Sequence, residues 1–216
     1  MTQSKYVSEL KNQFKDKVIV ITGSTQGIGA ETAKLFACRG AKAITICGRN
    51  EENGLKVKKE IEQIGSECLF VKADLAEVDQ CKNIIHSTEK SFGTVHSLIN
   101  AAGCTERGTI LSTTLENFEK NININFRAPF FLMQESIKIM RRDKNKGTIA
   151  NILSIAAHSG MPFLAAYSSS KGALSVLIKN VANAISADQI RVNGLNVGWS
   201  DTPGEDFTQR KFHNGG

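Results

Sequence analysis

The segment Thr22-Gly23-Ser24-Thr25-Gln26-Gly27-Ile28-Gly29 joins a run of apolar residues to a stretch with helical character. Its glycines suit a tight turn whose backbone angles other residues resist, and they let a ligand approach the main chain closely. A helix that begins here would present unpaired N–H groups and a partial positive charge to a phosphate. Three glycines could form a plain loop, but their G-x-x-x-G-x-G spacing between strand and helix favours a dinucleotide site.

Short apolar runs alternate with helical segments along the rest of the chain. Several runs hold consecutive apolar or β-branched residues, which is typical of strands that a parallel sheet covers on both faces. The predicted strands are Val18–Thr22, Ala43–Cys47, Leu69–Val71, Ser97–Asn100, Thr148–Leu153 and Val192–Asn196. The predicted helices are Ile28–Arg39, Glu52–Ile64, Glu77–Phe92, Leu115–Met140 and Ala165–Ile185. This alternation predicts an α/β fold with a doubly wound parallel sheet, the Rossmann type.

Length and composition indicate one domain that works in a reducing compartment. The 216 residues divide into a polar lead at 1–16 and a dinucleotide-binding catalytic domain at 17–216. The sequence has no signal-peptide core, and none of its apolar runs approaches the ~18 residues of a membrane span. We therefore expect a cytoplasmic protein without membrane contact. The net charge of +6 is scattered, which favours solvated helix faces over a nucleic-acid groove. Five dispersed cysteines without a C-x-x-C motif indicate neither disulfides nor a metal site.

The end of the second predicted strand bears on the choice of cofactor. NAD-binding proteins usually carry an acid about 20 residues beyond the glycines, where it binds the ribose 2′-hydroxyl. Here Gly48 stands at that position and Arg49 follows it. A guanidinium can hold a 2′-phosphate through two hydrogen bonds, although an arginine in such a turn can also be a plain surface residue. We therefore favour NADP(H) over NAD(H).

Tyr167 and Lys171 lie four residues apart in a helical segment, so both side chains can reach one cleft. The reference pKa of tyrosine, near 10, is too high for easy proton exchange at neutral pH. A nearby ammonium lowers that pKa, and Tyr167 can then act as a general acid or base. A Y-x-x-x-K pair alone is weak evidence, because any helix can contain one by chance.

Further motifs stand in a consistent order around this pair. They are Asp74-Leu75, Asn100-Ala101-Ala102-Gly103, Asn125, Ser154 and the segment 198–202 ending at Thr202. With the glycine turn and Tyr167–Lys171, they resemble the short-chain dehydrogenase/reductase family from Lys17 to about His213. Two positions depart from its pattern: Ala101 replaces the second Asn of N-N-A-G, and Val197 stands where proline is usual.

The resemblance implies a hydride transfer between NADP(H) and a small carbonyl or secondary alcohol. Tyr167 would exchange a proton with the substrate oxygen, which Ser154 also hydrogen-bonds. Lys171 would lower the tyrosine pKa and bind the nicotinamide ribose, and Asn125 would hold a water that links Lys171 to solvent. With Arg49, the expected cofactor contacts are Gly23, Ser24, Thr25, Gln26, Gly27, Ile28, Gly29, Arg49, Asp74, Leu75, Asn100, Ala101, Ala102, Gly103, Tyr167, Lys171 and Thr202.

A non-catalytic dinucleotide-binding regulator or scaffold is the alternative, because a fold does not determine function. A family member that had lost its catalytic activity would be expected to lack Tyr167 or Lys171, and both are present. The substrate is not evident from the sequence. The residues expected at the substrate cleft suggest a partly apolar ligand, although several could equally belong to the core: Ala156, His158, Met161, Phe163, Leu164 and Trp199.

The family usually continues beyond the sixth strand through a substrate loop and a helix to a seventh strand. This sequence ends at Gly216, inside the region of that loop, and lacks the final helix and strand. The chain is either naturally shortened or part of a longer one. Loss of an edge strand would expose apolar surface and unpaired backbone groups, which favours the longer chain. With that segment present, we expect a homodimer or homotetramer.

Overall fold

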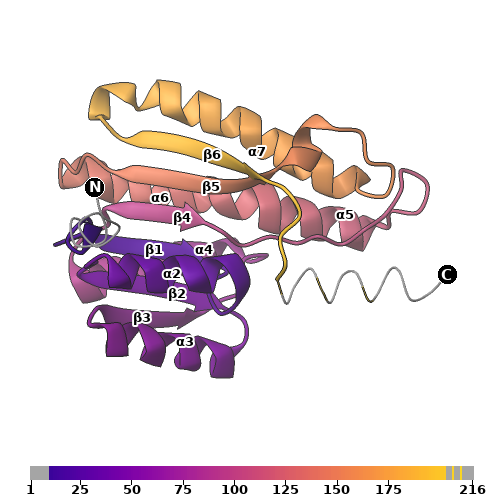
Figure 1. Cartoon of the computed structure of the whole chain (residues 1–216). Coiled ribbons are helices and arrows are strands. Elements are labelled where there is room, and N and C mark those ends of the chain that lie inside the picture. The colour runs from indigo at the N-terminus through magenta and orange to yellow at the C-terminus, as the bar shows by residue number, and fades with distance from the viewer. Residues whose placement is uncertain (1–9, 203–205, 207–209, 211–216) are drawn as a thin grey trace, which may run out of the picture.

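The computed structural model describes residues 10–202 together with 206 and 210. A sheet of six parallel strands forms its centre, in the order β3-β2-β1-β4-β5-β6 (Figure 1). The predicted doubly wound sheet is therefore confirmed. Residues 1–9 of the predicted lead, and the segment beyond Thr202 apart from 206 and 210, lie outside the described residues.

The strands confirm all six sequence predictions; β1 and β4 have the predicted bounds, and the other four differ by one or two residues at one or both ends. The strands are β1 (Val18–Thr22), β2 (Ala43–Gly48), β3 (Glu67–Lys72), β4 (Ser97–Asn100), β5 (Thr148–Ser154) and β6 (Arg191–Val197). β3 is longer than predicted because polar residues at its two ends, Glu67 and Lys72, still pair with β2. All five residues of β1 are buried, as expected for a strand covered on both faces.

The helices also lie near their predicted positions, with one exception. They are α2 (Gly27–Cys38), α3 (Glu51–Ile64), α4 (Val78–Phe92), α5 (Leu115–Ile122), α6 (Ala128–Arg142) and α7 (Ala165–Ala184), with short 3₁₀ turns η2 (Ile155–His158) and η3 (Ser186–Asp188). The continuous helix predicted over Leu115–Met140 is wrong. A π-helical turn, η1 (Asn123–Arg127), separates α5 from α6. Within it, the side chain of Asn125 bonds to the main chain of Cys104, a contact that sequence periodicity does not reveal.

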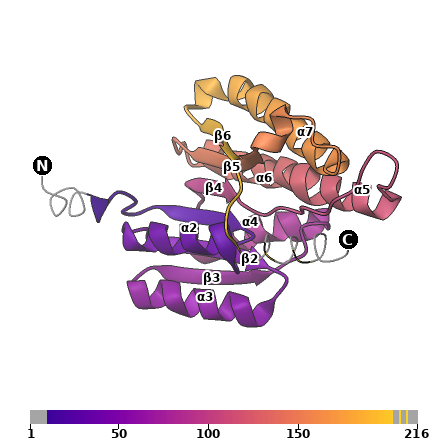
Figure 2. The same cartoon turned by 45° about the vertical axis from the view of Figure 1, so that its right-hand side comes forward.

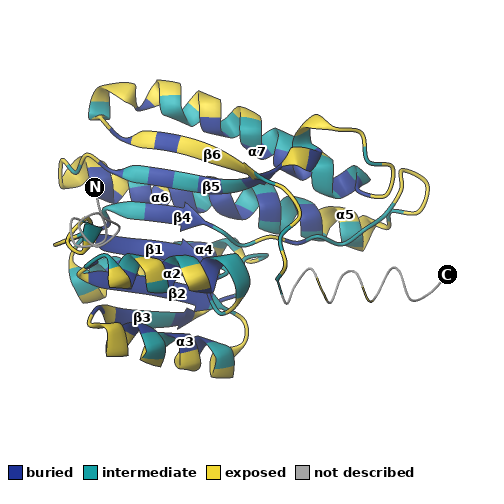
Figure 3. Cartoon of the chain, viewed as in Figure 1, coloured by how far each residue is buried: buried dark blue, intermediate teal, exposed yellow. Residues whose placement is uncertain are grey.

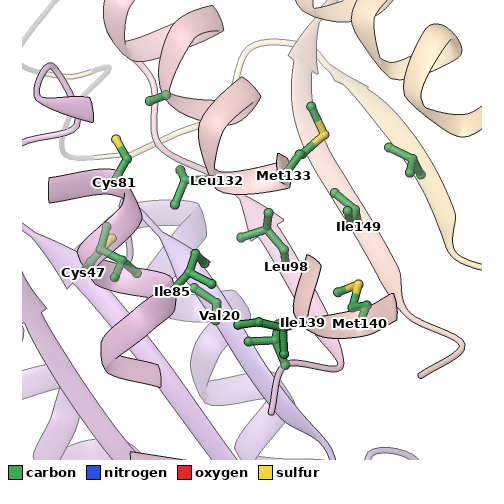
Figure 4. Close-up of a cluster of buried hydrophobic side chains, with 14 of the residues drawn as sticks. Val20, Cys47, Cys81, Ile85, Leu98, Leu132, Met133, Ile139, Met140 and Ile149 are labelled. Carbon is green, nitrogen blue, oxygen red and sulfur yellow. The ribbon is translucent and has the colours of Figure 1, made fainter. Parts of the chain in front are cut away.

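Helices cover both faces of the sheet, as two views of the molecule show (Figures 1 and 2). Side chains of α4, α6 and α7 pack with β1, β4, β5 and β6 in one apolar cluster, part of which is drawn in Figure 4. α2 and α3 cover the opposite face, where Ala30, Ala33, Val57 and Ile61 form a second cluster with β1 and β2. The central strands are the most deeply buried part of the chain (Figure 3). Among the described residues, no helix is both long and apolar enough to cross a membrane.

The end of the polar lead packs on the domain. Phe14 contacts Phe36 of α2 edge to face, with ring centroids 4.6 Å apart, and joins the cluster beneath α2. The main-chain N–H of Phe14 also donates to the carbonyl of Arg39. The part of the lead that the structure describes therefore contributes to the core, although its composition is polar.

His96 contributes a pH-sensitive contact at the start of β1. Its Nδ1 accepts a hydrogen bond from the main-chain N–H of Val18 at 3.0 Å, which requires an unprotonated Nδ1. Burial lowers the pKa of His96, helped by Lys17 and Lys42 and opposed by Asp143 and Asp16. His96 therefore binds a proton more readily in the unfolded chain than in the folded chain, so acidic pH favours unfolding.

We expect the free energy of unfolding to fall as the pH drops below about 6.5, the ordinary pKa of histidine. His96→Gln removes the titration and keeps an acceptor for Val18, so its stability should change less between pH 7.5 and 5.5. Urea unfolding at both pH values measures this difference. His158→Gln, at an exposed position, serves as the control. An equal pH response in His96→Gln and the original protein would contradict the assignment.

Candidate active site and cofactor cleft

The candidate site lies at the carboxyl ends of the strands, where the sheet order reverses. β1 lies between β2 and β4, so the loops that follow β1 and β4 lead to helices on opposite faces. Ligands of open α/β sheets bind at such a switch point. A cavity opens here, and its walls come from loops after β1, β2, β3, β4, β5 and β6 and from the start of α7.

The glycine turn is held in place by contacts that leave no room for side chains. Gly23 has a φ of +61°, and a Cβ built on it would lie 2.6 Å from the Cα of Ala102. A Cβ on Gly29 would lie 2.4 Å from the carbonyl oxygen of Gly23. Both glycines are therefore required, the first for the approach of two loops and the second for the packing of α2 on its own turn.

The N-terminus of α2 has the character of an anion site. Its N-cap residue, Gln26, makes no capping hydrogen bond, and no acidic residue lies in the first turn. The side chains of Asn50 and Thr114 cap α3 and α5, whereas α4, α6 and α7 also lack a capping side chain; of the uncapped ends, that of α2 lies on the cavity wall with the glycine turn. The first N–H groups of α2 and the positive end of its dipole are thus left for a ligand in the cleft.

Ser24 and Thr25 have different surroundings although both belong to the predicted turn. The Ser24 hydroxyl is fully buried; it donates to the carbonyl of Ile21 at 2.6 Å and accepts from the N–H of Cys47 at 3.0 Å. Ser24 therefore ties the turn to β2 and is absent from the cavity wall. Thr25 lines the cavity, and a Cβ built on Gly48 would lie 2.6 Å from its Cγ2. Thr25 thus occupies the space that an acidic side chain at position 48 would need.

Arg49 and Asp74 lie on the wall at the β2 and β3 ends of the cleft. Arg49 is exposed and, within the described part of the chain, makes no ion pair or hydrogen bond through its side chain. Asp74 accepts a hydrogen bond from the N–H of Ala76 at 2.9 Å through Oδ1. The N-cap of α4 is Glu77, so Asp74 shapes the loop before the helix and does not cap it.

Lys171 is a buried cation on the wall of the cleft. Only 3% of the residue is exposed, and its Nζ donates to the carbonyl of Ile152 at 2.7 Å. Burial lowers its pKa to about 8. The ammonium can form further hydrogen bonds toward the cavity, because it has three donors.

Ser154 and Tyr167 line the same cavity. Ser154 ends β5, and its Oγ accepts a hydrogen bond from the N–H of Ala156 at 3.2 Å. This contact orients the hydroxyl and leaves its hydrogen for donation. Tyr167 lies in the first turn of α7, one turn before Lys171. Three of the four predicted catalytic side chains therefore meet at one cavity.

Asn125, the fourth, lies beneath the wall and is fully buried. Its Nδ2 donates to the carbonyl of Cys104 at 2.9 Å, with further contacts to Ser170 and Asn121, and its Oδ1 accepts from the N–H of Cys104 at 2.8 Å. A Cβ built on Gly103 would lie 3.7 Å from this Oδ1 and 3.9 Å from Nζ of Lys171. Asn125 therefore fixes the loop after β4 close to the lysine.

The residues predicted to contact the cofactor fall into two groups, those on the cavity wall and those away from it. The cavity wall includes Gly23, Thr25, Gln26, Gly27, Ile28, Gly29, Arg49, Asp74, Leu75, Ala101, Ala102, Gly103, Tyr167, Lys171 and Thr202. It includes neither Ser24 nor Asn100. Asn100 is buried in the sheet, where its Nδ2 donates to Oδ1 of Asn151 on β5 at 2.8 Å. Contact with a cofactor remains a prediction for all of these residues, those on the wall and these two alike.

The cavity wall also includes residues that were expected at the substrate cleft, and one residue that the sequence did not reveal. Ala156, Met161, Leu164 and Trp199 line it as expected, but His158 and Phe163 do not. His158 instead contacts the side chain of Asn196 at 3.2 Å. Phe163 and Trp199 lie against the guanidinium of Arg107, with ring centroids 5.2 and 6.0 Å away. Arg107 lines the cavity, and no motif pointed to it.

Comparison with known proteins identifies the family. The family described as short chain dehydrogenase matches residues 17–211. The NADP-dependent (R)-specific alcohol dehydrogenase of Lentilactobacillus kefiri is 34% identical over 200 residues, 90% of this chain and 77% of that relative. Levodione reductase has a TM-score of 0.88 at 26% identity, covering 94% of this chain and 79% of its own. NAD+-bound xylitol dehydrogenase has a TM-score of 0.85 at 28% identity, covering 92% and 75%. The chain belongs to the short-chain dehydrogenase/reductase family.

Family membership makes the chain an oxidoreductase of the class that acts on CH–OH groups. The family uses NAD or NADP, and the cleft fits such a dinucleotide in three respects. The glycine turn leaves a cradle at Gly23 and Gly29, the first turn of α2 lacks a capping side chain, and cations stand at both ends as Arg49 and Lys171. The described residues contain no group of three or more potential metal ligands.

Lys171 should reduce the stability of the cofactor-free protein. A pKa held near 8 means that the charged form is disfavoured by burial, by roughly 3 kcal/mol at pH 7. We expect Lys171→Met to raise the melting temperature by several degrees at pH 7. This increase in melting temperature should become smaller between pH 8 and 10.5. In that range the lysine of the original protein loses its proton on folding, so the cost of burying the charge falls as the pH rises. Calorimetry across this range measures it, with the exposed Lys56→Met as control. A lower melting temperature for Lys171→Met would contradict the argument.

Proposed function

We propose that this protein reduces a small carbonyl compound to an alcohol, or oxidises the alcohol, with NADP(H) as its cofactor. The observation that carries the proposal is the convergence of Ser154, Tyr167 and Lys171 on the cavity that the glycine turn also lines. A dinucleotide laid from Arg49 toward Lys171 would pass over the first turn of α2. When bound, its nicotinamide supplies or accepts the hydride.

The preference for NADP(H) rests on the end of β2. Arg49 has no carboxylate partner among the described residues, so its guanidinium is available for a 2′-phosphate. Position 48 is a glycine covered by Thr25, so it supplies no acid for a free 2′-hydroxyl. The two features act together: the guanidinium attracts the 2′-phosphate, and position 48 lacks the carboxylate that would favour NAD(H).

Proton transfer in this proposal depends on the pair Tyr167 and Lys171. During reduction, the tyrosine hydroxyl gives its proton to the carbonyl oxygen of the substrate, and the nearby ammonium stabilises the phenolate that remains. During oxidation, the phenolate takes the proton back. The buried ammonium acts in a low-dielectric setting, so its effect on the phenol is larger than in water.

Ser154 and Asn125 have supporting parts. Ser154 donates its hydroxyl hydrogen to the same substrate oxygen, because its Oγ already accepts from Ala156. The side-chain nitrogen and oxygen of Asn125 both bond to protein groups, so a relay water near Lys171 would be held through the main-chain carbonyl of Asn125 or a remaining lone pair of Oδ1. Such a water would fit beside Gly103, which has no side chain to fill that space.

The cavity wall and the cysteines bear on the class of substrate and on the cellular setting. Apolar residues such as Met161, Leu164 and Trp199 on the wall support a partly apolar substrate. The five cysteines are all free, which supports a reducing compartment such as the cytoplasm. Assembly into a homodimer or homotetramer stays a prediction.

The acid–base assignment predicts that Tyr167→Phe lowers turnover at least about 100-fold, because the proton donor is lost. Affinity for NADPH should stay within about twofold of the original. The measurement is nicotinamide absorbance with a panel of ketones, aldehydes and secondary alcohols, and Ser169→Ala, exposed in the same turn, is the control. Near-normal rates in Tyr167→Phe would refute the role. A protein that binds NADPH but turns over nothing in a broad panel would refute the proposed reductase.

The cofactor assignment predicts a selective loss in Arg49→Gln. Removing a two-bond contact between guanidinium and phosphate should weaken NADPH binding about 10- to 100-fold and leave NADH binding nearly unchanged. Fluorescence titration of both cofactors measures the two affinities. Arg39→Gln removes a partly exposed arginine whose side chain bonds to Gln13 and is the matched control. Tighter binding of NADH than NADPH by the original protein would overturn the preference.

A further inference from the structure

The segment Asp74-Leu75-Ala76-Glu77, which we call the β3–α4 loop, forms the wall of the cleft at the end of β3. Asp74 and Leu75 line the cavity. In the proposed function, this is the side of the cleft that takes the adenosine half of the cofactor, because Arg49 lies on the same side. The position of the loop therefore decides how well that half fits.

Nearly all hydrogen bonds of the β3–α4 loop are local. Asp74 donates its N–H to the side chain of Gln80 at 2.8 Å, and its Oδ1 accepts from the N–H of Ala76 at 2.9 Å. The N–H of Glu77 donates to the carbonyl of Asp74, and the thiol of Cys81 contacts the carbonyl of Leu75. All of these partners lie between positions 74 and 81. They shape the loop but do not fix its position relative to the rest of the cleft.

Arg127 provides the distant connection. Its Nη2 donates to the carbonyl oxygen of Ala76, a residue 51 positions away in the sequence. Among the described residues, this is the one hydrogen bond that ties the loop to a part of the chain outside 74–81. The peptide groups on the two sides of Ala76 are thus both held, one N–H by Asp74 and one carbonyl by Arg127.

The setting of the guanidinium shows that this bond is its main interaction. Arg127 is half-buried, its Nε is buried without a hydrogen-bond partner, and it forms no ion pair with a described carboxylate. A buried Nε without a partner costs free energy, and the bond from Nη2 to Ala76 offsets that cost only in part. The bond that the guanidinium does make, to the β3–α4 loop, therefore points to a positioning role.

Arg127 also belongs to the turn that holds the other end of the cleft. It is the last residue of η1, and Asn125 in the same turn holds both main-chain groups of Cys104. From this π-helical turn, the side chain of Asn125 therefore reaches the loop after β4, and that of Arg127 reaches the β3–α4 loop. A shift of η1 would change the two ends of the cleft together.

We infer that Arg127 is a positioning residue for the adenosine half of the cofactor, acting through the carbonyl of Ala76 to hold Asp74 and Leu75 on the cavity wall. The inference rests on the proposed function for the identity of the ligand. It is separate from catalysis, because Arg127 does not line the cavity.

The test uses the two halves of the cofactor as separate probes. We expect Arg127→Met to weaken binding of adenosine 2′,5′-bisphosphate about tenfold, the usual effect of losing one charge-assisted hydrogen bond. Binding of nicotinamide mononucleotide should not change. With the complete cofactor, KM for NADPH should rise by a similar factor while kcat stays within about twofold. Arg127→Lys retains one donor for Ala76 and should recover part of the affinity.

A measurement without ligand separates this inference from the proposed function. Amide hydrogen exchange in Arg127→Met should accelerate in a peptide that covers 74–77 and stay unchanged in one that covers 101–104. Arg141→Met, which removes an exposed ion pair with Asp188 from α6, is the matched control. Unchanged exchange and fragment affinity in Arg127→Met, or an equal loss for both fragments, would overturn the inference. Retained binding of the adenosine fragment without turnover of any substrate would overturn the reductase and leave Arg127 in place.

Discussion

The close approach of the glycine turn to the end of β4 is the constraint on which the rest of the cleft depends. The Thr22 hydroxyl accepts from the N–H groups of Ala101 and Ala102, both at 3.2 Å, and Gly23 lies so close to Ala102 that no side chain would fit. This contact joins two loops that leave the sheet toward opposite faces. Because it fixes their distance, the anion site at α2 and the Gly103 segment beside the buried lysine form one continuous cleft.

The π-helical turn η1 organises the other side of the cleft. In a regular helix, residues two positions apart point in different directions, and this turn uses that difference to reach two separate loops. Asn125 binds the main chain of Cys104, and Arg127 binds the carbonyl of Ala76. Such turns are frequent at functional sites because a wider turn can re-aim side chains without ending the helix. Here it couples the loops after β3 and β4.

The charges of the cleft reflect a balance between stability and function. Lys171 stays buried with one carbonyl partner, and burial lowers its pKa to about 8. That is unfavourable for the folded chain alone, but it places a cation one helical turn from Tyr167 on the wall of the same cavity. Arg49 is exposed and carries little desolvation cost. This difference in burial agrees with their proposed roles, in which Lys171 assists proton transfer and Arg49 binds the 2′-phosphate of the cofactor.

The sequence by itself determined the sheet, the glycine turn, the Tyr167–Lys171 pair and the family, because these depend on local periodicity and on the order of short motifs. It did not show that Asn123–Arg127 interrupts a helix, that the Ser24 hydroxyl turns inward, or that Arg107 lines the cavity. Those features arise from contacts between residues far apart in the chain, such as Asn125 with Cys104 and Arg127 with the β3–α4 loop. Only tertiary structure decides them, because the packing of the helices and strands determines which side chains come into contact.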